Sequence, residues 1–525
     1  MPAANRSSPA TPVVRLTLTV VLALVLSGCA LDLSPDDDPD AQPAPSLSPR
    51  PLTPGGNQPI PGANLDEFYD QTVSWEGCRS GKMCATIQVP LDYAAPGARS
   101  ISLSMIKVPA GDKSQRVGSL IVNPGGPGVS GVEYAAQASL YFGTELRRAF
   151  DIVGFDPRGV GESTPVECLS DEELDAFVAS DPDPDTAAER DLADQMLLDL
   201  GRGCAEEAGD LAGHVSTAEA ARDIDIIRSV LGDERLSYFG ASYGTFLGAT
   251  YADLFPKRVG RMVLDGAVDP SLSTRETTLV QAGGFETALR AYVGHCVDAG
   301  GCFLGQSVDA GAERIRGFLD EVESQPVETS GERPLAAGNA VLGVWMALYN
   351  EDYWTLLDAA LRSAFDGDGT ALLLLADAYA HRGRDGYIDN ALEALYAVNC
   401  LDQDDAIPIA EVPARVDEFE RVSPTFGAIF AYGLASCGEW PFQSQRVPEA
   451  IEAQGAAPII VVGTTRDPAT PLEWAESLAS QLDSGVLVRR DGDGHTGYNA
   501  GNDCVDEVVE SYLVSGKTPR AEVNC

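Results

Sequence analysis

Apolar positions along this chain of 525 residues gather into short runs that alternate with helical patterns. Continuous apolar runs bounded by turn residues predict buried strands. These runs lie at residues 117–122, 150–155, 236–239, 261–264, 458–462 and 485–489. Residues 85–91 and 100–108 alternate instead, and a Pro/Gly turn joins them, which predicts an antiparallel hairpin. Strands that alternate with helices indicate a mostly parallel sheet.

Helical periodicity dominates the segment from 270 to 440, where clear strands are absent. A helical insertion before the last two predicted strands indicates an α/β fold, a mostly parallel sheet with an inserted helical cap. We therefore expect the folded chain to have three parts. They are residues 65–269 (first part of the α/β core), 270–440 (helical cap) and 441–525 (second part of the core).

The N-terminus has the pattern of an export signal. Arg6 and Arg15 precede an apolar run at 16–26, which is too short to span a membrane as a mature helix. The run ends in Leu-Ser-Gly-Cys29, which resembles a bacterial lipobox. We expect a lipoprotein signal peptide at 1–28 and an acylated Cys29 that anchors the exported protein to the outer face of the cell membrane, or extracellular release. An ordinary secretory signal cleaved nearby is the alternative.

Residues 29–64 are rich in Pro, Asp and Ser and cannot bury enough apolar surface to fold, so we expect a disordered tether after the acylated cysteine. The formal net charge of the chain is -43, which argues against a nucleic-acid partner because such proteins need a basic surface. The charge fits either a soluble acidic surface or a site that attracts cationic substrates.

The chain has eleven cysteines, which agrees with export. Setting Cys29 aside for acylation leaves an even number, which an oxidising compartment would pair. Spacing does not determine the connectivity, and the nearest-neighbour expectation is Cys78–Cys84, Cys168–Cys204, Cys296–Cys302, Cys400–Cys437 and Cys504–Cys525. No cysteine has metal-ligand spacing with the four histidines, so we expect no metal site and no cofactor.

The stretch that carries chemistry is Gly240-Ala-Ser242-Tyr-Gly244, which follows the predicted strand 236–239 and precedes a helical pattern of small residues. A serine on a sharp strand-to-helix turn is strained and exposed, and glycines on either side leave room for the turn. The stretch predicts the nucleophile elbow of an α/β-hydrolase. A glycine-rich loop with an ordinary surface serine is the alternative.

A nucleophilic serine needs a histidine base, and the histidine needs an orienting carboxylate. In this fold the chain order is Ser, then Asp or Glu, then His. Asp467 follows the strand 458–462, and His495 follows the strand 485–489. Both lie at carboxyl ends of strands, where open α/β sheets bind ligands. We predict a triad of Ser242, Asp467 and His495.

The tetrahedral intermediate of acyl transfer needs two N–H donors. The backbone of Tyr243, which follows the nucleophile, is the first candidate. The second is Gly126, in the Pro/Gly loop after strand 117–122, because glycine lets the backbone approach the substrate closely. A plain Pro/Gly turn is the alternative for this loop.

Several motifs occur together along the chain. They are Gly125-Gly-Pro-Gly128, Asp156-x-Arg158-Gly-x-Gly161-x-Ser163, Gly240-x-Ser242-x-Gly244, Asp467-Pro-x-Thr470, Gly494-His495-Thr496, Cys400 with Cys437-x-x-Trp440-Pro441, and Cys504. From about residue 70 to 525 the chain therefore resembles the secreted bacterial tripeptidyl-aminopeptidase-like proteins, within the prolyl-iminopeptidase type of α/β-hydrolases. One departure is Asn123-Pro124, where prolyl iminopeptidases carry His-Gly-type starts, so a preference for proline does not follow.

The resemblance implies a serine exopeptidase, of the tripeptidyl or dipeptidyl aminopeptidase type, that cleaves peptides from a free N-terminus through an acyl-enzyme. Such an enzyme needs a negative pocket for the substrate ammonium group, because an unpaired buried charge is costly. Asp402 and Glu439 in the cap are the candidates for this contact. We expect Arg158 to pair with Asp156 and to hold its loop rather than to bind substrate.

Two other functions fit parts of the sequence. A carboxylesterase or lipase would use the same triad, since the fold does not choose between esters and peptides. A noncatalytic lipoprotein that binds or scaffolds would not need the triad, and the presence of Ser242, Asp467 and His495 argues against it. A requirement for a free substrate amine separates the peptidase from the esterase.

Overall fold

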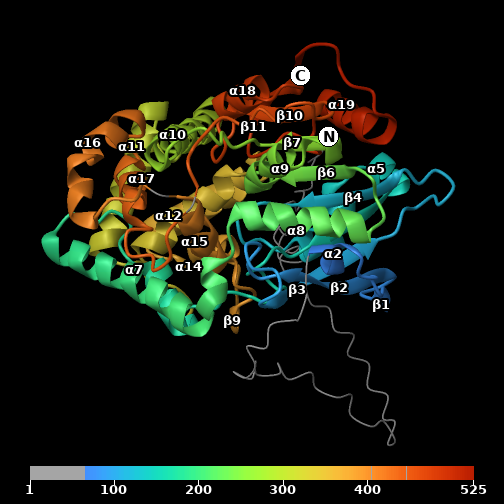
Figure 1. Cartoon of the computed structure of the whole chain (residues 1–525). Helices are drawn as coiled ribbons and strands as arrows, with labels where there is room; N and C mark the ends of the chain where they lie inside the picture. The colour runs from blue at the N-terminus through green and yellow to red at the C-terminus, as the bar shows by residue number, and fades with distance from the viewer. Residues whose placement is uncertain (1–64, 404, 445) are drawn as a thin grey trace, which may run out of the picture. The chain divides into compact units, whose positions relative to one another are not determined.

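The computed structural model describes residues 65–525 except 404 and 445. The predicted signal peptide at 1–28, Cys29 and the tether at 29–64 lie outside the described residues. Within them, a sheet forms in the order β1-β2-β3-β5-β4-β6-β7-β10-β11-β12 (Figure 1). The strands are β1 Glu76–Cys78, β2 Lys82–Pro90, β3 Ser100–Val108, β4 Gly118–Asn123, β5 Phe150–Phe155, β6 Leu236–Ala241, β7 Val259–Asp265, β10 Ile459–Arg466, β11 Gly485–Asp493 and β12 Val523–Asn524.

Pairing in this sheet is mostly parallel. Strands β1, β2, β3 and β5 form an antiparallel ladder, and the predicted hairpin is β2–β3. From β5 onward, through β4, β6, β7, β10, β11 and β12, every pairing is parallel. The predicted α/β class and the leading hairpin are therefore confirmed.

Helices cover both faces of the sheet, because successive side chains of a strand point to opposite faces. Leu120 and Val122 of β4 belong to one hydrophobic cluster and Ile121 to another. The first cluster includes residues of α3, α5 and α19, and the second includes residues of α8, α9 and α18. The bounds are α3 Gly131–Ala136, α5 Thr144–Ala149, α19 Asp503–Ser515, α8 Thr217–Val230, α9 Tyr243–Leu254 and α18 Leu472–Gln481; the short helices α2 Leu65–Tyr69 and α4 Ala138–Tyr141 also lie in the core.

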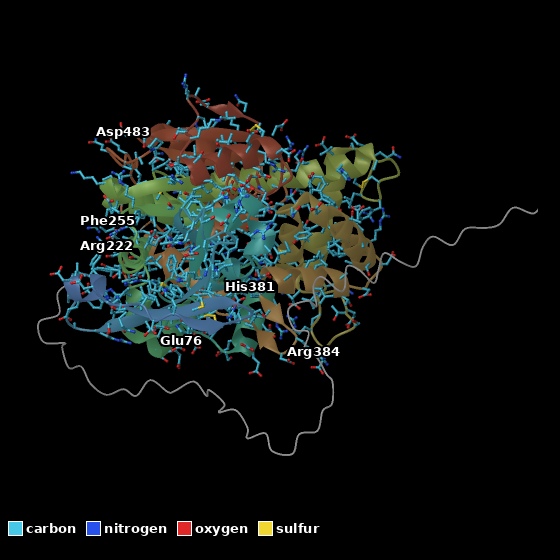
Figure 2. All side chains as sticks on the ribbon, turned by 90° about the vertical axis from the view of Figure 1, so that its right-hand side faces the viewer. Glu76, Arg222, Phe255, His381, Arg384 and Asp483 are labelled. Atoms are coloured by element: carbon cyan, nitrogen blue, oxygen red, sulfur yellow. A yellow bond between two sulfur atoms is a disulfide. The ribbon has the colours of Figure 1, made fainter. Side chains whose placement is uncertain are left out.

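The segment between β7 and β10 is helical, as its periodicity predicts, and it has a hydrophobic cluster of its own. Its helices are α10 Thr274–Asp298, α11 Val308–Ser324, α12 Ala337–Leu348, α13 Trp354–Phe365, α14 Thr370–Tyr379, α15 Ala391–Asp402, α16 Val416–Val422 and α17 Gly427–Tyr432, with the 3-10 turns η3 Glu351–Tyr353, η4 Ile409–Ala414 and η5 Gly433–Ala435. A short hairpin also occurs here, β8 Arg382–Gly383 and β9 Gly386–Tyr387, with Arg384 at its turn (Figure 2).

Two helices outside this segment join the cap. Helices α6 Asp171–Ala179 and α7 Ala187–Glu207 follow β5 in the chain, within the predicted first part of the core. Helix α6 contacts α12, and α7 contacts η4. The cap therefore has two sources in the sequence, and the segment 270–440 forms only part of it.

The structure contains disulfides with all five predicted pairings: Cys78–Cys84, Cys168–Cys204, Cys296–Cys302, Cys400–Cys437 and Cys504–Cys525. The bonds Cys78–Cys84 and Cys296–Cys302 close short local segments, whereas Cys168–Cys204 and Cys400–Cys437 join cysteines 36 and 37 residues apart. Among the described residues, no helix has the length and apolarity needed to cross a membrane.

Candidate active site

Ser242 occupies the predicted turn between β6 and α9. Its backbone has φ 55° and ψ −128°, a conformation that is rare and strained for a residue with a side chain. Its N–H donates to the carbonyl of Asp265 at 2.9 Å, which ties the turn to the end of β7. A Cβ atom on Gly240 would lie 2.2 Å from the carbonyl oxygen of Gly244, so this turn requires glycine there. The sequence Gly-x-Ser-x-Gly thus builds the strained elbow that its pattern predicts.

Asp467 and His495 come together at the ends of β10 and β11. The Asp467 carboxylate is buried and lies 2.9 and 3.0 Å from Nδ1 of His495. It also accepts the backbone N–H groups of Ala469, Thr470 and Thr496 at 3.0, 2.8 and 3.0 Å. The carboxylate therefore accepts a hydrogen bond from Nδ1–H, which fixes the tautomer and orients the ring.

The other ring nitrogen of His495, Nε2, is buried and has no hydrogen-bond partner among the described residues. The end of β7 lies beside both the serine turn and His495. The Asp265 carbonyl accepts the N–H of Ser242, and a Cβ on Gly266 would lie 3.3 Å from Cε1 of His495. The contact between a catalytic serine and its base is often long in an unliganded enzyme. The arrangement leaves Nε2 free to take a proton.

The electrostatic surroundings favour the charged form of His495. Burial lowers the pKa of the imidazole, but the charge and hydrogen bond of Asp467, together with the charge of Asp265, raise the pKa by more than burial lowers it. The net effect is a pKa above the ordinary value for histidine. A more basic imidazole is a stronger acceptor for the proton of a serine hydroxyl.

The cap reaches His495 through Tyr349, which follows α12. The backbone N–H of His495 donates to the Tyr349 carbonyl at 2.8 Å. The two rings meet edge to face, with centroids 5.2 Å apart. Sequence reasoning missed this residue, because nothing in a helical pattern marks the one tyrosine that meets a histidine almost 150 positions away.

The Pro/Gly loop after β4 lies directly against the elbow. A Cβ on Gly125 would lie 2.9 Å from both the Ser242 Cβ and the Tyr243 nitrogen, and its φ is +98°. The N–H of Gly125 donates to the Asn123 side chain at 3.0 Å. Gly126 follows at once, with φ +107°. The structure therefore brings together the two backbone segments that the sequence proposed as oxyanion donors.

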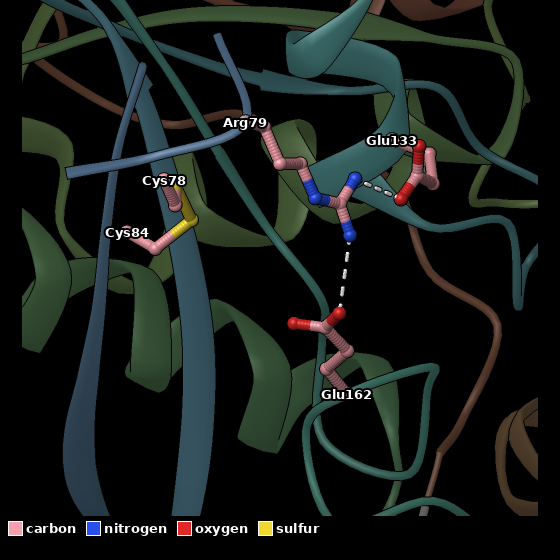
Figure 3. Close-up of a disulfide and its surroundings, with 5 residues drawn as sticks. All are labelled: Cys78, Arg79, Cys84, Glu133 and Glu162. Carbon is pink, nitrogen blue, oxygen red and sulfur yellow. Dashed lines mark hydrogen bonds and ion pairs between the residues drawn. A yellow bond between two sulfur atoms is a disulfide. The ribbon is translucent and has the colours of Figure 1, made fainter. Parts of the chain in front are cut away.

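Two side chains brace this loop. Asp156 accepts hydrogen bonds from the Ser130 hydroxyl at 2.6 Å and from the N–H of Glu162 at 2.9 Å, so it joins the loops after β4 and β5. Figure 3 shows Arg79 reaching from the β1–β2 turn, beside its disulfide, to Glu133 and Glu162. Arg79 thereby ties the β1–β2 turn to α3 and to the loop after β5.

The prediction that Arg158 pairs with Asp156 is wrong. Arg158 is fully buried and forms two hydrogen bonds of 2.7 Å with Asp223 of α8, while its remaining N–H groups donate to carbonyls, including that of Leu91 at 2.8 Å. Asp156 is occupied by the loop contacts above. A buried guanidinium needs a full set of acceptors, and α8 supplies the charged one.

The two predicted amine-binding carboxylates lie in different surroundings. Asp402 is buried, accepts both the N–H and the hydroxyl of Thr217, and burial raises its pKa to about 6. The Thr217 hydroxyl also meets that of Tyr243 at 2.5 Å, so Asp402 is linked to the first turn of α9. Glu439 is exposed. Asp402 is therefore buried and connected through Thr217 to the residue that follows Ser242, whereas Glu439 lies on the surface.

Metal-ligating side chains gather elsewhere. In the part of the chain that the structure describes, three groups bring ligand atoms within 4.8 Å of one another. They are Asp92, His214 and Glu219; Asp181, Asp183 and Glu323; and Asp185, Glu189 and Glu323. None of these groups includes Ser242, Asp467 or His495.

This fold, with a strained serine at the end of β6 and a histidine–carboxylate pair at the ends of β10 and β11, defines a hydrolase of the α/β-hydrolase class. The family described as alpha/beta hydrolase fold matches residues 118–314, and the family described as TAP-like protein matches residues 423–525. The chain is 38% identical over 483 residues to the serine protease Hip1 of Mycobacterium tuberculosis, across 87% of this chain and 91% of that protein. The chain belongs to the TAP-like family of α/β-hydrolases.

Two further relatives have different names. The chain is 37% identical over 499 residues to the carboxylesterase B of Mycobacterium tuberculosis, across 92% of this chain and 94% of that protein. It is 30% identical over 478 residues to the tripeptidyl aminopeptidase of Streptomyces lividans, across 86% of each. The family that the sequence motifs resemble is thereby confirmed.

Proposed function

We propose that this protein is a serine exopeptidase that releases dipeptides or tripeptides from the free N-terminus of peptides. The single observation that carries the serine-hydrolase chemistry of this proposal is the strained Ser242 turn together with the Asp467–His495 pair. In this reaction the Ser242 hydroxyl attacks the scissile carbonyl carbon while Nε2 of His495 takes its proton. The proton then passes to the leaving amine, and water hydrolyses the acyl-enzyme by the same route. Asp467 orients the imidazole and stabilises its charged form.

The oxyanion of the tetrahedral intermediate binds two backbone N–H groups, those of Tyr243 and Gly126. Tyr243 is the first residue of α9, so its N–H has no acceptor within the helix and lies at the positive end of the helix dipole. In the Pro/Gly loop, Asn123 already occupies the N–H of Gly125, which leaves the next N–H for the substrate. Glycine at 125 is what allows the loop to approach this closely.

Two observations support an exopeptidase. The cap contacts the catalytic histidine directly through Tyr349, so it limits access to the site from one side. A covered site admits the end of a peptide more readily than the middle of a folded chain. A relative of this chain, 30% identical, is named a tripeptidyl aminopeptidase.

The second candidate function is a carboxylesterase. The observation that favours it is the relative named carboxylesterase B, which is 37% identical to this chain. The same serine, histidine and oxyanion donors hydrolyse an ester, which has a better leaving group than an amide.

The test is a release assay on the purified full chain. It compares chromogenic amides of tripeptides and single amino acids, free or N-acetylated, with a short-chain ester, and Ser242→Ala is the control. Cleavage of free-amine tripeptides that disappears on acetylation and in the variant supports the exopeptidase. Ester cleavage without amide turnover would refute it and leave the esterase.

We also propose that the protein is exported and anchored to the outer face of the cell membrane through an acylated Cys29. The lipobox-like Leu-Ser-Gly-Cys29 sequence supports this, and the five disulfides fit an oxidising compartment. The test is incorporation of labelled palmitate into the protein in bacterial cells. Label that persists in Cys29→Ser would contradict the proposal.

A further inference from the structure

A second buried carboxylate lies beside the catalytic residues. Asp265, at the end of β7, is 1% exposed. Its backbone carbonyl accepts the N–H of Ser242 at 2.9 Å. Its carboxylate oxygens accept the N–H groups of Gly497 and Tyr498 at 2.8 and 2.9 Å. One residue therefore contacts both the serine turn and the loop that carries His495.

The loop that carries His495 needs such support, because its backbone is strained. Thr496 has φ +70°, a left-handed conformation that a β-branched residue rarely adopts. Conformations of this kind persist only when the surrounding structure holds them from several directions. Asp467 accepts hydrogen bonds from the His495 ring and from the N–H of Thr496. Asp265 accepts the N–H groups of the next two residues, Gly497 and Tyr498. The loop is thus held between two carboxylates from neighbouring strands.

Asp265 also acts on His495 through its charge. It is one of the groups that raise the pKa of the imidazole, and His495 in turn lowers the pKa of Asp265. Burial is the larger effect on Asp265 and raises its pKa to about 6. The other titratable groups that act on this carboxyl or respond to its charge are Asp467, from the loop after β10, and Tyr134, from α3. Tyr498 faces it through its backbone N–H.

We propose that Asp265 is a positioning residue for His495, which holds the loop 496–498 and stabilises the imidazolium that forms when Ser242 loses its proton. This inference rests on the proposed role of Ser242 and His495 as nucleophile and base. It assigns the reaction two carboxylates: Asp467, which contacts the imidazole, and Asp265, which acts through the adjoining backbone and through space.

The test compares Asp265→Asn with Asp269→Asn in the full chain. Asp269 is a matched control, since it is also buried and accepts the Ser271 N–H at 2.9 Å and the Gln481 side chain at 2.7 Å, away from His495. The readout is the rate at which a fluorophosphonate modifies Ser242 between pH 5 and 9. This rate follows the neutral fraction of His495 and needs no knowledge of the substrate.

We expect Asp265→Asn to lower the modification rate at pH 8 by roughly ten- to a hundredfold, since small displacements of a base are costly. We also expect its acid limb to move to lower pH by about half a unit or more, because an opposing charge has been removed. Asp269→Asn should leave both unchanged. A folded Asp265→Asn with the wild-type rate and acid limb would overturn the inference.

Asp265→Glu keeps the test decisive if the asparagine variant does not fold. It retains the charge but moves the carboxylate, so the acid limb should stay in place while the rate falls. A wild-type rate in this variant would overturn the positioning role. Failure of the wild-type protein to react at Ser242 would instead refute the proposed function, so the two failures are distinguishable.

Discussion

Replacement of Asp467 by asparagine tests the site most directly, because it removes a charge with little change of shape. The two carboxylate oxygens lie 2.9 and 3.0 Å from Nδ1 of His495, whose N–H they accept. They also accept three backbone N–H groups. An asparagine can keep its oxygen toward Ala469 and Thr470, but its NH₂ group then faces the donors of Thr496 and His495. The NH₂ group, at the Oδ2 position 3.0 Å from Nδ1, can donate to that nitrogen and so favours the wrong tautomer, and the negative charge that stabilises the imidazolium is lost.

The expected cost follows from these contacts. Loss of the orienting carboxylate in a serine triad lowers kcat by about 10⁴-fold. At about 1.36 kcal/mol per factor of ten, this corresponds to roughly 5.4 kcal/mol of transition-state stabilisation. The unpaired N–H of Thr496 should lower the free energy of unfolding by about 1–3 kcal/mol, because it is buried without an acceptor. The catalytic effect is therefore larger than the effect on stability.

The assay measures kcat on the best substrate from the release assay, with the free energy of unfolding from urea denaturation of the same preparation. Asp269→Asn is the control, a buried aspartate that does not contact His495. The acid limb of kcat/KM should also move to lower pH in Asp467→Asn, because Asp467 raises the pKa of His495. A kcat within about tenfold of the wild type, in a folded variant, would refute the reasoning.

Three further predictions concern the scaffold. Gly125→Ala should abolish fluorophosphonate labelling and lower the free energy of unfolding by at least about 1–2 kcal/mol, because its φ is +98° and the new Cβ would lie 2.6 Å from the Ala241 carbonyl; full labelling would contradict this. Burial and nearby carboxylates raise the pKa of Asp183 to about 7, so the folded chain binds a proton that the unfolded chain has lost above about pH 4. The stabilisation that comes from this bound proton is lost as the pH rises through 7, so the thermal midpoint should be higher at pH 5.5 than at pH 8. Asp183→Asn should reduce this difference, and an undiminished difference would refute the assignment of the effect to Asp183. Replacing Cys400 and Cys437 by serine opens a loop with a sequence separation of 37 and should cost about 3–4 kcal/mol in urea denaturation, whereas an unchanged midpoint would show that the bond adds nothing.

Much of the fold was predictable from local pattern. The apolar runs are strands, the hairpin at 85–108 is antiparallel, and the segment 270–440 is helical. The order of Ser242, Asp467 and His495 along the chain and their positions after strands could also be read directly. The nearest-neighbour expectation for the five cysteine pairs is confirmed, although spacing by itself does not determine the connectivity.

Features that depend on contacts between distant segments were not predictable. Arg158 pairs with Asp223 rather than with its neighbour Asp156, because the fold brings α8 to a buried guanidinium that needs a charged acceptor. Helices α6 and α7 join the cap although they precede the elbow in sequence. Tyr349, directly after α12, gave no signal in the sequence, since its contact with His495 depends on which strand end the cap meets.

The sequence by itself therefore determined the α/β class, the helical insertion, the family and the residues proposed for acyl transfer. Periodicity and short motifs suffice for these, because they reflect which face of an element is buried and which turns need glycine. The tertiary structure alone decided the strained backbone at Thr496, and it placed Asp265 between the Ser242 turn and the loop that carries His495. The reason is that strand order places the ends of β6, β7, β10 and β11 side by side, and no local pattern records which buried carboxylate will lie among them.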